Sequence, residues 1–273
     1  MKKLKKFLIV LIGMIVIGTF FYSQNKWITV ESVTVQSARI PQNFDEFKIM
    51  HISDLHGQYF GKNQSNLLKK IDTFKPDIIA ITGDLFDSSY DDEASFNLIE
   101  QLSDYPIYFV TGNHEAWDGH YEELEMLLVE LGIHILHNEH QLLEIGGQSI
   151  ELVGIDDPAF GGTVDNNLSV ALKGTNHDNF KLLLSHRPET FETYVNSNVD
   201  LVLTGHAHGG QFRIPFLGGL VAPDQGLLPK FEEGIHTKNN TTMIISRGLG
   251  NSIIPQRLLN RPHLIEIILK AGA

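Results

Sequence analysis

The 273-residue sequence contains no cysteine. This absence excludes disulfide bonds, a thiolate metal site and a cysteine nucleophile. Any metal ion that the chain binds must therefore be held by nitrogen and oxygen ligands. The compartment stays open, because a chain without disulfides can lie on either side of a membrane.

Basic residues are also scarce. Lysine and arginine number 21 against 33 aspartates and glutamates, which gives a formal net charge of -12. A nucleic-acid groove needs basic side chains to replace the counterions of the phosphate backbone, so we expect no nucleic-acid partner. Solvated surface carboxylates account for most of the acidity, and bound divalent cations would offset part of it.

The N-terminus joins a basic stretch to an apolar one. Residues 1–6 contain four lysines, and residues 7–22 form an uncharged apolar run. As a helix these 16 residues span about 24 Å. A bilayer usually requires ~20 residues, so the run is slightly short. Flanking lysines can extend it by snorkelling. We predict a basic cytoplasmic N-terminus over 1–6 and a transmembrane signal anchor over 7–22.

A cleaved signal peptide is the alternative to an anchor, because it also begins with basic residues and a short apolar core. No small-x-small cleavage site follows the run, whose exit is Thr19-Phe20-Phe21-Tyr22-Ser23. Lysines before the span favour a cytoplasmic N-terminus. We therefore expect a single-pass protein of the cell membrane with its main domain on the extracytoplasmic face.

The rest of the chain alternates short apolar runs with polar loops. Residues 23–44 are predicted to be a connector with a first strand over 27–35, and residues 45–273 to be one domain. Buried strands are predicted over 48–52, 77–82, 107–111, 150–155, 181–185, 199–204, 242–246 and 264–269. Helices are predicted over 65–74, 94–102, 121–131 and 188–195. The alternation predicts βαβ units in the first half, and the strand-rich second half predicts a second sheet.

Side chains that can bind metal follow five of the predicted strands directly. They are Asp54 and His56, Asp84, Asn113 with its neighbour His114, His186, and His206 with His208. The carboxyl ends of such strands meet at one rim of an α/β sheet, where ligands bind. Each fragment alone is weak, since Asp-x-His is usually a turn and a lone histidine is usually structural. Their joint occurrence predicts a metal site.

The order Asp-x-His, Gly-Asp, Gly-Asn-His-Glu, His, Gly-His-x-His resembles the calcineurin-like metallophosphoesterase superfamily over roughly residues 45–273. The sequence Gly-Gly-Gln-Phe-Arg-Ile-Pro after His208 and Ser-Arg-Gly-Leu-Gly over 246–250 are most similar to the bacterial membrane-associated branch, which includes UDP-2,3-diacylglucosamine pyrophosphatases. The resemblance implies an α/β fold of the metallophosphoesterase type, a four-layer αββα sandwich of two mixed sheets flanked by helices, behind one N-terminal transmembrane helix.

The resemblance also implies two divalent metal ions bridged by Asp84. Asp54, His56 and His208 would complete one metal site, and Asn113, His186 and His206 would complete the other. Mixed oxygen and imidazole ligands suit Mn²⁺, Fe²⁺ or Zn²⁺, among which the sequence does not decide. The implied reaction is in-line attack on phosphorus by a hydroxide that bridges the metals.

Residues around the metals have weaker assignments. His114 resembles the catalytic histidine of the family, with a third metal ligand from the same loop as the alternative. Asp87 would orient His114, or is a turn residue. Arg247 and Asn251 are candidates for substrate binding, although a surface arginine explains Arg247 almost as well. Gln211 and Arg213 are candidates of the same kind. Asp156 and Asp157 could line the cleft, although Asp-Pro is first a turn signal.

The predicted function is a metal-dependent phosphodiesterase or pyrophosphatase that acts on a lipid-linked or cell-surface phosphate ester. A broad phosphomonoesterase is the alternative within the same chemistry. A non-catalytic membrane-anchored scaffold that retains the metal site, or a receptor that uses its metals structurally, are alternatives from other classes. Nothing in the sequence indicates the oligomeric state.

Overall fold

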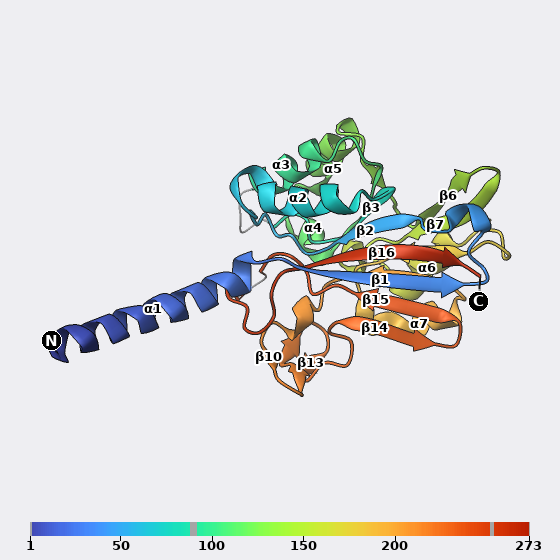
Figure 1. Ribbon diagram of the computed structural model, residues 1–273. Coiled ribbons are helices and arrows are strands. Elements are labelled where there is room, and N and C mark those ends of the chain that lie inside the picture. The colour runs from blue at the N-terminus through green and yellow to red at the C-terminus, as the bar shows by residue number, and fades with distance from the viewer. Residues whose placement is uncertain (1, 88–91, 252–253, 273) are drawn as a thin grey trace.

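Two six-stranded sheets lie face to face in the computed structural model, which describes residues 2–87, 92–251 and 254–272 (Figure 1). The first sheet has the order β1 (Thr29–Ser37), β16 (His263–Ala271), β2 (Lys48–Ile52), β3 (Ile78–Thr82), β4 (Ile107–Val110), β5 (His134–Ile135). The second has the order β14 (Gly234–Lys238), β15 (Thr241–Ile245), β9 (Leu201–Thr204), β8 (Lys181–Leu184), β7 (Gln148–Gly154), β6 (Glu139–Ile145).

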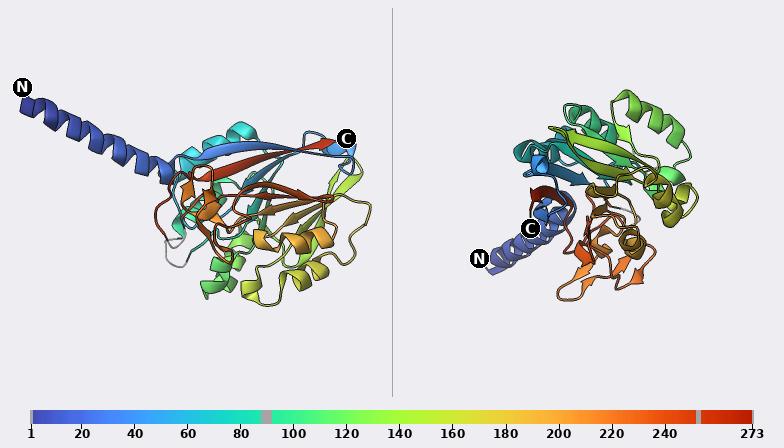
Figure 2. Two further views of the ribbon diagram at one scale, coloured as in Figure 1. Left: turned by 90° about the horizontal axis from the view of Figure 1, so that it is seen from below. Right: turned by 90° about the vertical axis from the view of Figure 1, so that its right-hand side faces the viewer.

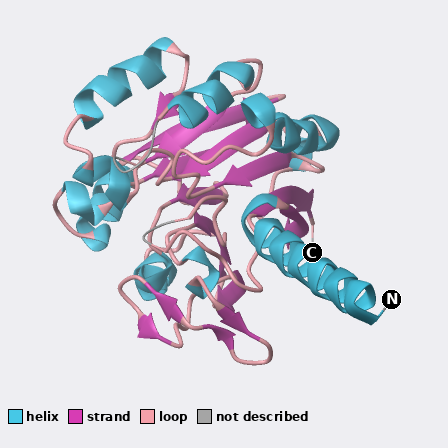
Figure 3. Ribbon diagram, turned by 90° about the vertical axis from the view of Figure 1, so that its left-hand side faces the viewer, coloured by secondary structure: helices cyan, strands magenta, loops and turns pink. Residues whose placement is uncertain are grey.

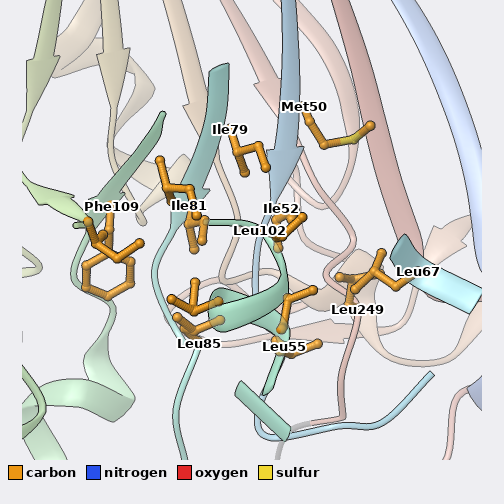
Figure 4. Close-up of a cluster of buried hydrophobic side chains, with 14 of the residues drawn as sticks. Met50, Ile52, Leu55, Leu67, Ile79, Ile81, Leu85, Leu102, Phe109 and Leu249 are labelled. Carbon is orange, nitrogen blue, oxygen red and sulfur yellow. The ribbon is translucent and has the colours of Figure 1, made fainter. Parts of the chain in front are cut away.

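Helices cover the outer face of each sheet. They are α2 (Ser65–Phe74), α3 (Glu93–Gln101), α4 (Asn113–Trp117) and α5 (Tyr121–Glu130) beside the first sheet, and α6 (Val164–Ala171) and α7 (Phe191–Asn196) beside the second. Apolar side chains of β2, β3 and β4, such as Met50, Ile79 and Phe109, pack with the helices in one core (Figure 4). A second core lies between the sheets, and a third lies under α6 and α7. The predicted four-layer αββα class is confirmed.

Both sheets are mixed, and their central strands are parallel. In the first sheet β2, β3 and β4 run parallel, and β16 runs antiparallel to β2. In the second sheet β7, β8, β9 and β15 run parallel. The apolar residues of β3, β4, β8 and β9 are buried throughout because each of these strands is covered on both faces.

The first helix, α1 (Lys2–Lys26), stands apart from the body and projects from one end of it (Figures 1 and 2). It is longer than the predicted run over 7–22, and it is long and apolar enough to cross a membrane. Its base is fixed to the body: the side-chain amide of Asn25 donates to the Pro255 carbonyl (2.9 Å), and its oxygen accepts from the backbone N–H of Arg257 (2.9 Å).

The strand ends that bear the predicted ligands lie at the same end of the body as α1. Strand β1 follows α1 and runs away from it, and β16 is parallel to β1. Since β2 is antiparallel to β16, the carboxyl ends of β2, β3 and β4 point back toward α1. Figure 3, viewed toward this end, shows the loops gathered in its centre.

Two short hairpins complete this end of the body. They are β10 (Arg213–Ile214) with β11 (Gly218–Gly219), and β12 (Val221–Ala222) with β13 (Gly226–Leu227). Neither hairpin, nor α6, β6 or β14, is predicted by the sequence pattern. The first strand begins and ends two residues later than the predicted 27–35. It pairs with β16 along its whole length, so part of the predicted connector over 23–44 belongs to the first sheet.

Candidate metal centre

The structure brings the predicted metal-binding side chains together in two groups. One holds Asp54, His56, Asp84 and His208, and the other holds Asp84, His186 and His206; within each group the potential ligand atoms lie within 4.8 Å of one another. All six side chains are buried. Asp84 is the member that both groups share.

One oxygen of Asp84 faces both groups. Oδ2 lies 3.6 Å from Nε2 of His56 and 3.3 Å from Nε2 of His186. The other oxygen, Oδ1, accepts a hydrogen bond from the backbone N–H of His114 (2.9 Å), which fixes the orientation of the carboxylate. A carboxylate held in this way can bridge two cations.

The surrounding nitrogen and oxygen atoms fit cations. Nε2 of His56 lies 3.2 Å from Nε2 of His208, and Nδ1 of His206 lies 3.1 Å from Nε2 of His186. An imidazole nitrogen in its unprotonated form offers a lone pair to a cation. Among the described residues, the buried Oδ1 of Asn113 has no hydrogen-bond donor. This orphaned oxygen and the facing nitrogens form a suitable ligand set for divalent metals.

The backbone at these ligands is strained. Five of the seven predicted ligands are in the left-handed region, namely Asp54 (φ 50°), His56 (φ 47°), Asp84 (φ 51°), His206 (φ 64°) and His208 (φ 47°). Residues other than glycine rarely adopt this conformation, which costs on the order of 1 kcal/mol or more each and concentrates at functional sites.

Glu115 joins two of the ligand loops. Its carboxylate accepts hydrogen bonds from the backbone N–H groups of Asp84 (2.9 Å), Leu85 (2.8 Å), Phe86 (3.1 Å) and Gly112 (2.7 Å). The side chain is fully buried. Glu115 belongs to the Gly-Asn-His-Glu motif, but the sequence predicts no role for it, because its partners are backbone groups that a sequence does not reveal.

Asp87 lies between two histidines. Its Oδ2 is 3.0 Å from Nδ1 of His56 and 3.3 Å from Nδ1 of His114. The two imidazole rings meet edge to face with centroids 4.5 Å apart. The predicted contact between Asp87 and His114 is present, and the contact with His56 was not foreseen. A carboxylate on the remote nitrogen of a ligating histidine fixes its tautomer.

Burial and neighbouring charges set the protonation of the site. Burial opposes the charge of Asp84, but the His186, His56 and His114 imidazoles hold its pKa well below its usual range. Burial lowers the pKa of His208 well below its usual value, which favours the neutral ring, the form in which an imidazole can bind a metal ion. Burial also opposes protonation of His114, but Asp87 and Asp84 raise its pKa above the usual value. A histidine in this state can donate a proton.

A second polar network, which the sequence pattern does not predict, lies on the far side of His206. Arg187 binds Asp157 through two hydrogen bonds, from Nε (2.5 Å) and Nη2 (2.9 Å), and also pairs with Asp224. Asp224 Oδ2 lies 3.0 Å from Nε2 of His206. The signal available in the sequence was the position of Arg187 directly after His186. Its partner Asp157, already a candidate, is thirty residues away in the chain and meets Arg187 only in the fold.

The outer candidates lie close to the site but are engaged elsewhere. Arg247 pairs with Glu233 through Nη1 (2.6 Å). Arg213 donates to Glu233 as well. Asn251 donates to Gln58 (3.3 Å), while its own side-chain oxygen is buried with no donor among the described residues. No contact on its own gives Arg247 or Asn251 a role in substrate binding.

Comparison with known proteins bears on this site. A family model described as calcineurin-like phosphoesterase matches residues 47–210. The uncharacterized metallophosphoesterase YkuE of Bacillus subtilis is 30% identical over 262 residues, which cover 92% of this chain and 88% of that protein. Phosphodiesterase YaeI of Escherichia coli is 28% identical over 259 residues, 92% of each chain. A bovine transmembrane protein with a metallophosphoesterase domain is 31% identical over 263 residues, and the match covers 89% of this chain but only 57% of the relative.

Proposed function

Because the chain belongs to the calcineurin-like phosphoesterase family, we propose that it binds two divalent metal ions bridged by Asp84 and cleaves a phosphodiester or pyrophosphate bond. The order of motifs in the sequence predicted this family. Membership makes the protein a metal-dependent phosphoric ester hydrolase. The observation that supports a binuclear centre most directly is the position of Asp84 Oδ2, which faces His56 on one side and His186 on the other.

The proposed ligands are divided between the two ions in the same way as the two groups of side chains described above. Asp54, His56 and His208 would hold one ion, and Asn113, His186 and His206 would hold the other. When bound, the cations supply positive charge for the phosphoryl oxygens and lower the pKa of the attacking water. Mn²⁺, Fe²⁺ and Zn²⁺ all suit this ligand set.

Protein side chains perform the remaining chemistry in this proposal. His114 is partly exposed, with 12% of its side chain accessible, and its pKa is raised, so its ring can donate a proton to the departing oxygen. Asp87 orients this ring through Nδ1 and leaves Nε2 to face the substrate. Arg247 and Asn251, on the segment that packs against the Asp54 loop, are proposed to contact the substrate farther from phosphorus.

Diester specificity is supported by the Escherichia coli relative that is named a phosphodiesterase. A membrane location is supported by α1 and by the bovine relative that is named a transmembrane protein. We further propose that α1 anchors the protein with its N-terminus in the cytoplasm and its catalytic domain outside. The substrate would then be a lipid-linked or cell-surface phosphate ester.

The test combines metal analysis with a comparison of two chromogenic substrates. The purified full-length chain should contain two divalent ions and hydrolyse bis-p-nitrophenyl phosphate faster than p-nitrophenyl phosphate. Asp84→Asn should lose both ions and the activity, whereas Asp178→Asn, a change at a fully exposed carboxylate, should match the wild type. Preference for the monoester would indicate the phosphomonoesterase. A chain that is loaded with Mn²⁺ and inert on every diester and pyrophosphate would indicate the scaffold.

A further inference from the structure

An apolar cavity adjoins the candidate metal centre. It has a volume of about 300 Å³ and is lined by His208 and Gln211 and by the apolar side chains of Ala207, Val221, Ala222, Pro223 and Ile254. The amide nitrogen of Gln211 donates to the carbonyls of Ile254 (2.8 Å) and Gln256 (2.9 Å), so this donor is not free for a ligand. A polar group placed in this cavity would find few hydrogen-bond partners, which favours a hydrocarbon occupant.

The wall of this cavity continues into an exposed apolar surface. Val221 and Ala222 form β12, which pairs with β13 at Leu227 and Gly226. Leu227 is 76% exposed, and Phe216, in the turn of the neighbouring hairpin, is fully exposed. Ile214, Leu217 and Leu228 on the same two hairpins are exposed as well. Large apolar side chains gathered in this way mark an interaction surface.

The two hairpins lie at the end of the body from which α1 projects (Figure 1). Phe20 and Gln24 of α1 line a second cavity together with Arg213, at the start of the first hairpin, and Leu259. A bilayer crossed by α1 would therefore lie next to the hairpins. Exposed aromatic and aliphatic side chains in this position suit the interface of that bilayer.

From these observations we infer that the cavity beside His208 is a subsite for the hydrocarbon chain of a lipid phosphoester. The chain would enter from the bilayer past the hairpins, while its phosphate group reaches the metal centre on the other side of His208. This inference rests on the proposed function and narrows its substrate to phosphoesters that carry an alkyl, acyl or prenyl chain. Each methylene buried in such a cavity contributes ~0.8 kcal/mol, which corresponds to roughly a fourfold gain in kcat/KM.

Alkyl p-nitrophenyl phosphates that differ only in chain length test this inference. The full-length chain in a maltoside detergent should cleave the hexyl ester with a kcat/KM at least tenfold higher than that of the methyl ester. Val221→Trp, which fills the cavity, should bring the hexyl-to-methyl ratio close to one. Ile254→Ser makes the wall polar at a partly exposed position and should lower the ratio even if Val221→Trp does not fold. Leu142→Ser, at an exposed leucine of β6, should leave both rates unchanged.

The possible failures can be told apart. Equal kcat/KM for the two esters in the wild type overturns the chain subsite but leaves the proposed hydrolase intact. The preference for the hexyl ester could also persist in Ile254→Ser and in folded Val221→Trp. Partition of the ester into the micelle would then be its cause, and this result also overturns the subsite. Absence of turnover for both esters in a chain loaded with metal overturns the proposed function itself.

Discussion

The carboxylate of Asp224 lies 3.0 Å from Nε2 of His206, while Nδ1 of the same ring faces His186. Asp224 is on the turn between β12 and β13, and its side chain is 57% exposed. The hairpin beside the apolar cavity thus reaches back to the candidate metal centre. Nη1 of Arg187, which pairs with Asp224, also lies 2.9 Å from this Nε2. Asp224 and Arg187 together hold the Nε2 side of the ring, which leaves Nδ1 to face a metal ion.

Asp224→Asn should therefore weaken metal binding at the site of His186 and His206. Loss of a carboxylate that orients a ligating histidine typically costs 10- to 100-fold in metal affinity. We expect a loss of this size for one of the two ions, measured as bound metal in buffers of defined Mn²⁺ concentration. Asp178→Asn removes the same charge at an exposed site and should have no effect. Equal metal affinities in the wild type and Asp224→Asn would show that Asp224 does not position His206.

His114 and Asp87 should differ in their effects although they touch each other. His114→Gln removes the proposed proton donor and should lower kcat by roughly 10²- to 10⁴-fold while both metal ions stay bound. Asp87→Asn disturbs His56 as well as His114, so it should lower both kcat and the affinity for the ion at His56. Metal content and kcat measured on the same preparations distinguish the two. Loss of a metal ion in His114→Gln would instead indicate that His114 is a ligand.

Much of the fold could be predicted because apolar runs in the sequence indicate which segments are buried. The strand Lys48–Ile52 and the helix Ser65–Phe74 have the predicted bounds, since each is set by a clear local pattern and a terminating residue. Strands β6 and β14 were missed because they are edge strands with mostly exposed side chains. The short hairpins over 213–227 were missed because two-residue strands have no readable period.

The residues of the candidate metal centre that follow strands could be predicted from the sequence, whereas those farther out could not. Asp54, Asp84 and His206 were predicted as ligands because each closely follows an apolar strand, and the structure brings them together. Asp224 was not, because it follows no such strand and reaches the site only through the pairing of β12 with β13. The left-handed backbone at the ligands was equally hidden, since nothing in a local sequence requires it of an aspartate or a histidine.

The close approach of Gly112 to Asp84 gives a prediction about packing. A Cβ atom on Gly112 would lie 2.2 Å from Oδ1 of Asp84, a distance that no side chain can accept. Gly112→Ala should displace this carboxylate and lower the occupancy of both metal ions. Gly132→Ala is the control: its φ of +82° strains alanine, but nothing lies within 4 Å of the new Cβ. The control should lose about 1 kcal/mol of stability and no metal. Normal metal content in Gly112→Ala would contradict a bridging role for Asp84.

The last prediction concerns stability below neutral pH and depends on His51. Burial, with the nearby His263 as a second cause, lowers the pKa of His51 from 6.5 to about 3. Its Nε2 lies 2.8 Å from the hydroxyl of Thr82, and its Nδ1 is buried with no partner among the described residues. A proton on this ring is therefore costly in the folded chain and free of such cost in the unfolded chain.

The sign follows from where each state takes up the proton. Well above pH 6.5 His51 is neutral in both states, and its contribution to stability is fully present. As the pH falls through 6.5 toward 3, the unfolded state gains a proton that the folded state does not bind. The free energy of unfolding should then fall by up to about 1.4 kcal/mol per pH unit.

His51→Gln removes this dependence and keeps a polar group near Thr82. Chemical denaturation of the metal-free wild type and variant at pH 7 and pH 5 measures the effect. The variant should be less stable than the wild type at pH 7 because its packing is changed. The difference between them should shrink by up to about 2 kcal/mol at pH 5, where only the wild type bears the penalty. A difference that is the same at both pH values would show that His51 takes up a proton equally in the two states, and that its burial does not control its charge.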